Sequence, residues 1–184
     1  MEQRQLGRTG IAVSVLGYGC GAIGGLMVKG SAAEQDRAIA RAIDHGITYF
    51  DTAYAYGEGV SEANLGRALK ALKANVTVGT KVRIYDTQRG DIAGTITASL
   101  EGSLARLGRD SVDIYQLHNA ITRDGLAPSF TAEQILDDAV PAFVACATRA
   151  NAAPSASPAS VMRRRCDTCW KKAASPPPRC PATC

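Results

Sequence analysis

Four side chains suited to proton transfer lie near the ends of three short apolar segments. Asp51 and Tyr56 follow the first segment, Lys81 ends the second, and His118 follows the third. A carbonyl group that receives hydride also needs a proton on its oxygen, and a phenol with an ordinary pKa near 10 is a poor donor at neutral pH by itself. A neighbouring ammonium stabilises the phenolate, and a carboxylate holds that ammonium in place. An imidazole can then orient the carbonyl oxygen through a hydrogen bond.

The segments that must position these residues alternate between strand and helix patterns. Runs of β-branched and aromatic residues predict core strands at residues 14–19, 47–51, 76–81 and 112–117. Apolar spacing of three and four residues predicts helices at 31–45, 62–72, 91–107 and 131–143. Ser61 and Thr131 are the expected N-caps of the second and fourth helices, and residues 4–13 predict a β-hairpin. Strictly alternating strands and helices predict the α/β class, with a parallel sheet and right-handed crossovers. Asp51 and Tyr56 would then lie at the carboxyl end of a strand, where such folds have their active-site residues.

Composition divides the chain into two parts near residue 143. The net charge of the 184 residues is +4, but residues 144–184 hold seven Lys and Arg against one Asp, which leaves −2 for residues 1–143. The overall basic charge is therefore no argument for a nucleic-acid partner. No apolar run approaches the roughly 18 residues of a membrane span, and the N-terminus lacks the layout of a secretory signal. We expect a cytoplasmic protein without a membrane or nucleic-acid partner.

The segment 144–184 holds five of the six cysteines and six of the eight prolines, and contains no Gly, Leu or Ile. With so few large apolar residues it cannot build a core, and we expect it to be largely disordered. Its cysteines have a spacing that zinc sites permit, at positions Cys166, Cys169, Cys180 and Cys184. Zinc sites need tight turns and a small hydrophobic shell, which this composition does not favour, so we predict no metal site.

Glycines at positions 19, 21 and 24 match the spacing of a dinucleotide-binding fingerprint. A true fingerprint opens a helix immediately, whereas the next predicted helix begins only near Ser31. The late helix start therefore indicates a glycine-rich loop instead of a dinucleotide-binding fingerprint. It also disfavours a Rossmann-type dehydrogenase.

Several linked motifs resemble the aldo/keto reductase family, whose members are (β/α)₈ barrels that use NADPH or NADH. These motifs are Leu6-Gly7-Arg8-Thr9-Gly10, Phe50-Asp51-Thr52-Ala53-x-x-Tyr56-Gly57-x-Gly59-x-Ser61-Glu62, Thr80-Lys81-Val82 and Asp113-Ile114-Tyr115-Gln116-Leu117-His118. The resemblance covers about residues 4–143. It implies a partial TIM barrel, with about the first four β/α units, in residues 1–143.

The resemblance also implies roles for individual residues and a small-molecule carbonyl substrate. Tyr56 would be the proton donor, Lys81 and Asp51 the pair that tunes it, and His118 the group that orients the substrate. Tyr54 could be the phenol instead, but the family spacing from Asp51 favours Tyr56. Cys20 and Gly21, together with Asp51, would lie near the nicotinamide of NADPH or NADH.

Nothing in residues 144–184 resembles the later β/α units of the family, which hold most of the cofactor. An abrupt change to an Ala-, Pro-, Arg- and Cys-rich sequence suggests a frameshifted or truncated reductase with impaired turnover. We expect such a half barrel to associate through its unpaired strand edges. The alternative is a non-catalytic, barrel-derived regulatory or binding module.

Overall fold

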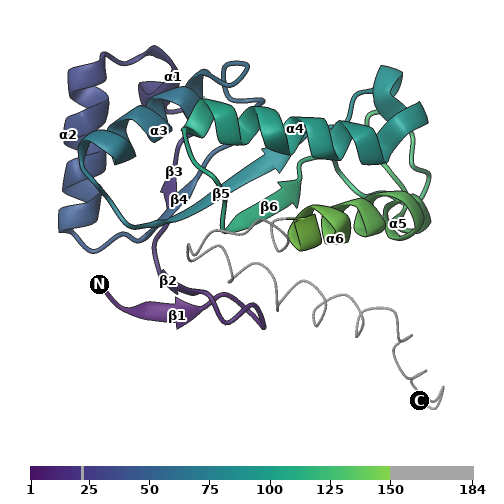
Figure 1. Cartoon of the computed structure of the whole chain (residues 1–184), viewed down its shortest axis with the longest axis horizontal. Helices are drawn as coiled ribbons and strands as arrows, with labels where there is room; N and C mark the ends of the chain where they lie inside the picture. Colours follow the sequence, from purple (N-terminus) through teal and green to yellow (C-terminus); the bar gives the residue numbers. More distant parts are fainter. Residues whose placement is uncertain (22, 150–184) are drawn as a thin grey trace, which may run out of the picture.

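A four-stranded parallel sheet lies at the centre of the computed structural model, which describes residues 1–21 and 23–149. Its strands, in the spatial order β3-β4-β5-β6, are Tyr18–Gly19 (β3), Tyr49–Asp51 (β4), Thr77–Val82 (β5) and Ile114–Leu117 (β6). Three long helices cover one face of this sheet in Figure 1, namely Ala32–Asp44 (α2), Val60–Ala71 (α3) and Ile92–Leu107 (α4). The predicted α/β class with a parallel sheet is confirmed.

The N-terminal residues form the predicted β-hairpin, with Gln3–Gln5 (β1) antiparallel to Ala12–Ser14 (β2). The prediction of one strand over residues 14–19 is wrong, because only Tyr18–Gly19 joins the parallel sheet. The hydroxyl of Ser14 donates to the carbonyl of Leu16 at 2.6 Å and accepts from the amide of Thr48 at 2.9 Å. One bond is local and the other joins residues 34 positions apart, and together they hold a bend in the chain between the hairpin and the sheet.

Local sequence signals account for the ends of two of the long helices. Ser31 caps α2 in a capping box with Glu34, and Asp91 caps α4 by accepting from the amide of Gly94 at 2.8 Å. Gly46 after α2 and Gly108 after α4 have positive φ angles of 82° and 61°, which glycine adopts without strain. A four-residue helix that we did not predict, Leu26–Lys29 (α1), follows the glycine-rich loop.

Ser61 is not the N-cap of α3, contrary to the prediction. The helix begins at Val60, two residues before the predicted start at residue 62, and follows Gly59 with a φ of 92°. Ser61 is completely buried, and its hydroxyl binds groups inside the molecule instead of the helix end.

The last helical region begins at Thr131, whose hydroxyl and backbone amide form the predicted N-cap with Gln134. It consists of Ala132–Gln134 (α5), a π-helical segment at Ile135–Ala139 and Val140–Arg149 (α6). The helix therefore continues beyond Phe143, where we expected it to end. Cys146 and Ala147 are buried in this continuation. A domain boundary at residue 143 stays a prediction. We expected residues 144–184 to be largely disordered, but residues 144–149 continue the helix. The rest of that expectation and the predicted absence of a zinc site concern residues 150–184, which lie outside the described residues.

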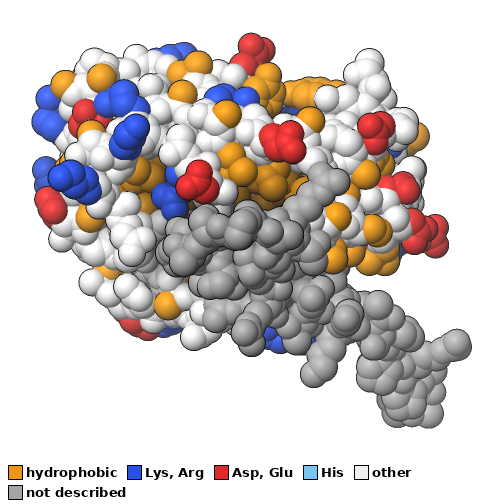
Figure 2. All heavy atoms as spheres, viewed as in Figure 1, with side chains coloured by type: hydrophobic (Ala, Val, Ile, Leu, Met, Phe, Trp, Pro, Cys, Tyr) orange, Lys and Arg blue, Asp and Glu red, His pale blue; other side chains and the backbone are white. Residues whose placement is uncertain are grey.

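The core lies between the sheet and its helices, where α2 packs on α3, α3 on α4, and α4 on α6. Phe50 and Val78 from the strands meet Ile39, Leu65 and Ile96 from the helices, and all five are fully buried. On the face shown in Figure 2, Lys and Arg side chains gather over the region where α2 and α3 lie in Figure 1. No helix among the described residues is long and apolar enough to cross a membrane.

Candidate active site

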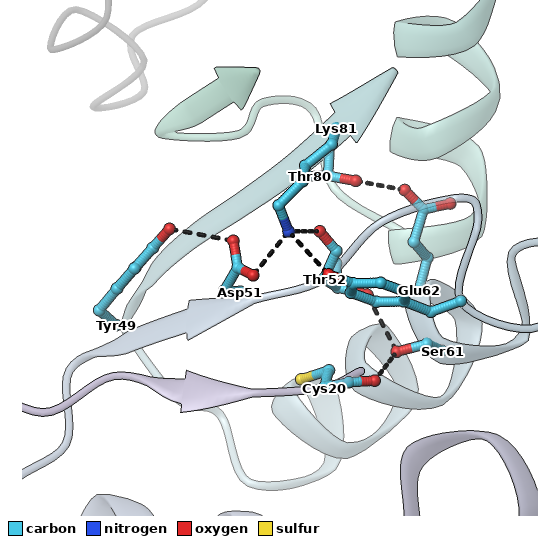
Figure 3. A network of polar contacts seen from close by, with 9 residues as sticks. Cys20, Tyr49, Asp51, Thr52, Ser61, Glu62, Thr80 and Lys81 are labelled. Atoms are coloured by element: carbon cyan, nitrogen blue, oxygen red, sulfur yellow. Dashed lines mark hydrogen bonds and ion pairs between the residues drawn. The ribbon is translucent and has the colours of Figure 1, made fainter. Parts of the chain in front are cut away.

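Asp51 and Lys81 come from neighbouring strands and form the centre of the candidate site. Asp51 pairs in register with Gly79, and Lys81 lies two residues farther along β5, so both side chains project from the same face of the sheet. The Nζ atom of Lys81 lies 2.6 Å from Oδ2 of Asp51, 2.9 Å from the carbonyl of Thr52 and 3.3 Å from Oη of Tyr56. An ammonium group has three N–H donors, and here each has an acceptor. Lys81 is therefore held in one orientation (Figure 3).

Tyr56 reaches this ammonium through a tight turn that follows β4. Its amide donates to the carbonyl of Ala53 at 3.1 Å, and Gly57 and Gly59 both have positive φ angles. A Cβ atom on Gly57 would lie 2.6 Å from a methyl carbon of Val28, so both the turn and the packing require glycine there. The turn thus places the Tyr56 hydroxyl beside the ammonium that also binds Asp51.

His118 follows the end of β6 and lies against the ring of Tyr56. Its amide donates to the carbonyl of Val82 at 2.7 Å, and its ring meets the Tyr56 ring edge-on with 5.7 Å between centroids. Burial lowers the pKa of His118, and the positive charges of Lys81 and Arg83 lower it further. Within the described residues, the buried Nδ1 atom has no hydrogen-bond partner. The imidazole is thus held neutral and keeps hydrogen-bonding capacity at the site.

Tyr49 is a member of the site that the sequence reasoning missed. Its hydroxyl donates to Oδ1 of Asp51 at 3.1 Å, so both carboxylate oxygens of Asp51 have a partner (Figure 3). Burial, and then the charge of Asp51, raises the pKa of Tyr49 and keeps it protonated. A signal was present in the sequence, because residues two apart on one strand project from the same face.

Cys20 and Gly21 lie at the end of β3, beside the other site residues. The Cys20 side chain is completely buried, and burial raises the pKa of its thiol to about 12. The Cys20 amide donates to the carbonyl of Asp51 at 2.8 Å, so Cys20 joins two strand ends. A Cβ atom on Gly21 would lie 3.8 Å from Cζ of Tyr56, which places Gly21 against the phenol ring. Contact of Cys20, Gly21 or Asp51 with a cofactor stays a prediction.

Tyr54, the alternative phenol, is directed elsewhere. Its ring lies against the guanidinium of Arg106, with 4.8 Å between the ring centroid and Cζ, and it lines a hollow of about 520 Å³ beside α4. Lys81 makes its hydrogen bond to Tyr56, so the geometry favours Tyr56 over Tyr54 as the phenol of the site.

Comparison with known proteins gives the family. The model of the aldo/keto reductase family matches residues 15–138. The chain belongs to the aldo/keto reductase family. It is 38% identical over 124 residues to L-galactose dehydrogenase of Arabidopsis thaliana, a match that covers 65% of this chain and 38% of that protein.

Solved aldo-keto reductases also have the fold of the described part. The holo form of an aldo-keto reductase from Bacillus halodurans matches with a TM-score of 0.63 and 29% identity over 81% of this chain and 47% of that one. An aldo/keto reductase from Klebsiella pneumoniae in complex with NADP and acetate matches with a TM-score of 0.59 and 27% identity over 77% of this chain and 44% of that one. The chain thus spans less than half of each of these relatives, and the prediction of a partial barrel is confirmed.

Proposed function

We propose that the site performs the protein part of carbonyl reduction, with Tyr56 as the proton donor to a small-molecule aldehyde, ketone or sugar carbonyl. The observation that carries this proposal is the contact of one ammonium, that of Lys81, with both the Tyr56 hydroxyl and the Asp51 carboxylate. The edge-on position of His118 on the Tyr56 ring agrees with a role in orienting the carbonyl oxygen.

Each residue then has one task in the proposed reaction. The Tyr56 hydroxyl transfers its proton to the carbonyl oxygen as the carbonyl carbon is reduced, and the Lys81 ammonium stabilises the phenolate that remains. Asp51 holds Lys81 and is itself held by Tyr49. Neutral His118 donates a hydrogen bond to the same carbonyl oxygen, which orients the substrate and stabilises the charge that develops on it.

The proposed cofactor is NADPH, with NADH as the alternative, and its chemistry is the supply of a hydride to the carbonyl carbon. The Klebsiella relative was solved with NADP. Gly21 supports the fit, because it presents only backbone next to the Tyr56 ring, where a Cβ atom would lie 3.8 Å from Cζ. Gly21 and Asp51 would border the nicotinamide. Cys20, whose side chain is buried, would contribute only its backbone.

Substitution of the two nearby phenols tests this proposal. Tyr56→Phe removes the proton donor and should lower the rate of NADPH-dependent carbonyl reduction by roughly 10²-fold or more. Tyr54→Phe is the matched control, because it removes a phenol from the same turn without touching Lys81, and it should keep most of the rate. Absorbance at 340 nm with a panel of aldehydes and ketones measures both. Equal rates for Tyr56→Phe and the unchanged chain, with a substrate that the unchanged chain reduces measurably above background, would contradict the assignment.

Impaired turnover by the 184-residue chain is a further part of the proposal, because nothing in residues 144–184 resembles the later β/α units that hold most of the cofactor in the family. A titration showing micromolar NADPH binding and rapid reduction by the 184-residue chain would contradict it. No observation favours the alternative of a non-catalytic module. Cytoplasmic location, a frameshift origin of the tail and self-association through the edge strands β3 and β6 stay predictions.

A further inference from the structure

Two neighbouring polar residues in the first turn of α3 are completely buried. Ser61 and Glu62 each have 0% of their surface exposed, on a helix whose buried residues are otherwise apolar. Burial of a hydroxyl, and far more of a carboxylate, is costly unless hydrogen bonds replace those lost to water. Both residues have such bonds, and their partners adjoin the residues of the proposed active site (Figure 3).

Ser61 connects α3 to the ends of two strands and to the turn that carries the phenol. Its hydroxyl lies 3.0 Å from the hydroxyl of Thr52 and donates to the carbonyl of Cys20 at 2.9 Å. Its amide donates to the carbonyl of Tyr56 at 3.2 Å. Thr52 directly follows Asp51, so Ser61 is bonded to Tyr56 itself and to the neighbour of Asp51.

Glu62 makes the corresponding connection to β5. Its Oε1 atom accepts from the hydroxyl of Thr80 at 2.5 Å, and its Oε2 atom accepts from Nε of Arg106 on α4 at 2.6 Å. Successive side chains on a strand project from opposite faces, so the direction of Thr80 determines the direction of Lys81. A bond that holds Thr80 toward the helices thereby holds Lys81 toward Asp51.

Arg106 reaches Glu62 through a gap that only glycine leaves open. A Cβ atom on Gly59 would lie 2.5 Å from Cδ of Arg106 and 2.6 Å from its Nε. The same guanidinium packs on the ring of Tyr54, two residues before Tyr56. Arg106 thus contacts both the buried carboxylate and the turn that carries the phenol.

We propose that Ser61 and Glu62, with Arg106 behind them, are positioning residues that hold Asp51, Tyr56 and Lys81 in the arrangement needed for proton transfer. The inference rests on the proposed function, but it concerns different residues. It assigns to the first turn of α3 the task of setting the directions of the side chains at the ends of β4 and β5.

The protons of the Lys81 ammonium report directly on this arrangement. Three acceptors surround Nζ, so its protons should exchange slowly enough with water to give a resolved nitrogen–proton NMR signal, assigned by its loss in Lys81→Met. Thr80→Val removes the bond to Glu62 with little change of shape, and Glu62→Gln removes the charge. In both variants we expect exchange of the Lys81 protons to be roughly tenfold faster, the factor that matches the loss of about one net hydrogen bond.

Arg67→Met is the matched control on the same helix. Arg67 pairs with Asp36 at 2.7 Å, but on the side of α3 that faces α2. Arg67→Met removes this pair and the hydrogen bond from Arg67 to Oε1 of Gln35 at 2.8 Å. Neither involves a partner of Lys81, so the Lys81 signal should stay within about twofold of the unchanged chain. Urea unfolding of every variant separates a local effect from a general loss of stability.

The possible outcomes are distinguishable. Unchanged exchange in Thr80→Val would overturn the positioning role, even if Glu62→Gln fails to fold. Equal acceleration in Arg67→Met would overturn it as well, because the effect would then be general loosening of α3. A missing Lys81 signal in the unchanged chain would count against the arrangement of Lys81, on which both proposals depend. If the unchanged chain shows a protected Lys81 signal but Tyr56→Phe reduces carbonyls at the normal rate, the proposed function alone would be overturned.

Discussion

The Asp51–Lys81 ion pair should contribute far more to stability than another pair of almost the same length. Asp51 and Lys81 approach to 2.6 Å with 27% and 12% of their side chains exposed, whereas Asp36 and Arg67 approach to 2.7 Å with 38% of each exposed. Distance alone would give the two pairs equal energies, so burial decides between them.

Unit charges about 3 Å apart attract by about 1.4 kcal/mol in water and by about 5.5 kcal/mol at an effective dielectric constant of 20. The cost of removing both ions from water offsets part of the larger value. A charged hydrogen bond of this kind contributes about 2 kcal/mol net. An exposed pair contributes about 0.5 kcal/mol, because solvent screens it.

Double-mutant cycles measure these two values. One cycle combines Asp51→Asn with Lys81→Met, and the control combines Asp36→Asn with Arg67→Met. Urea unfolding at pH 7, followed by circular dichroism, gives the free energy of unfolding of each variant. We expect a coupling energy of about 2 kcal/mol in the first cycle and about 0.5 kcal/mol in the second. Equal coupling energies would refute the argument that burial strengthens the active-site pair.

Two further predictions concern packing and charge. Gly66→Ala should lower the free energy of unfolding by at least about 2 kcal/mol, because the new Cβ would lie 2.2 Å from the carbonyl oxygen of Leu107. Gly90→Ala is the control, because nothing lies within 4 Å of the new Cβ, and its free energy of unfolding should stay within about 0.5 kcal/mol of that of the unchanged chain. Equal losses of stability in the two variants, measured by urea unfolding, would contradict the close approach of α3 and α4. The pKa of His118 is lowered in the folded chain, so on acidification His118 is protonated first in the unfolded chain. The free energy of unfolding should therefore decrease as the pH falls below 6.5, the ordinary pKa of histidine. A His118 NMR titration with its midpoint at or above 6.5 would contradict this, as would an equal loss of stability between pH 7 and 5 in His118→Gln.

Local patterns in the sequence predicted most elements of the described part. The helix at Ala32–Asp44 was predictable because its cap, its apolar spacing and its stop lie within one short segment. The strand at residues 14–19 was predicted wrongly for a related reason. Its apolar residues form a strand pattern, but hydrogen bonds of Ser14 to a residue 34 positions away and to Leu16 bend the chain.

The site shows what residue types and spacing could determine. They predicted that Asp51, Lys81 and His118 lie near one another, because in a parallel sheet the carboxyl ends of neighbouring strands lie together. They did not determine the choice between Tyr54 and Tyr56, which only the resemblance to a family favoured. In the folded chain the turn at Gly57 directs Tyr56 to Lys81, and Arg106 receives the ring of Tyr54.

The tertiary structure alone decided the partners of the buried polar groups. Ser61 resembled a helix cap in the sequence, yet its hydroxyl binds Thr52 and the carbonyl of Cys20, the latter 41 positions away. Glu62 resembled an ordinary first-turn acid, yet it binds Thr80 and Arg106 on two other elements. Helical and strand periodicity arise from neighbours within one element and therefore appear in the sequence. Contacts between elements depend on sheet register and helix packing, which exist only once the chain has folded.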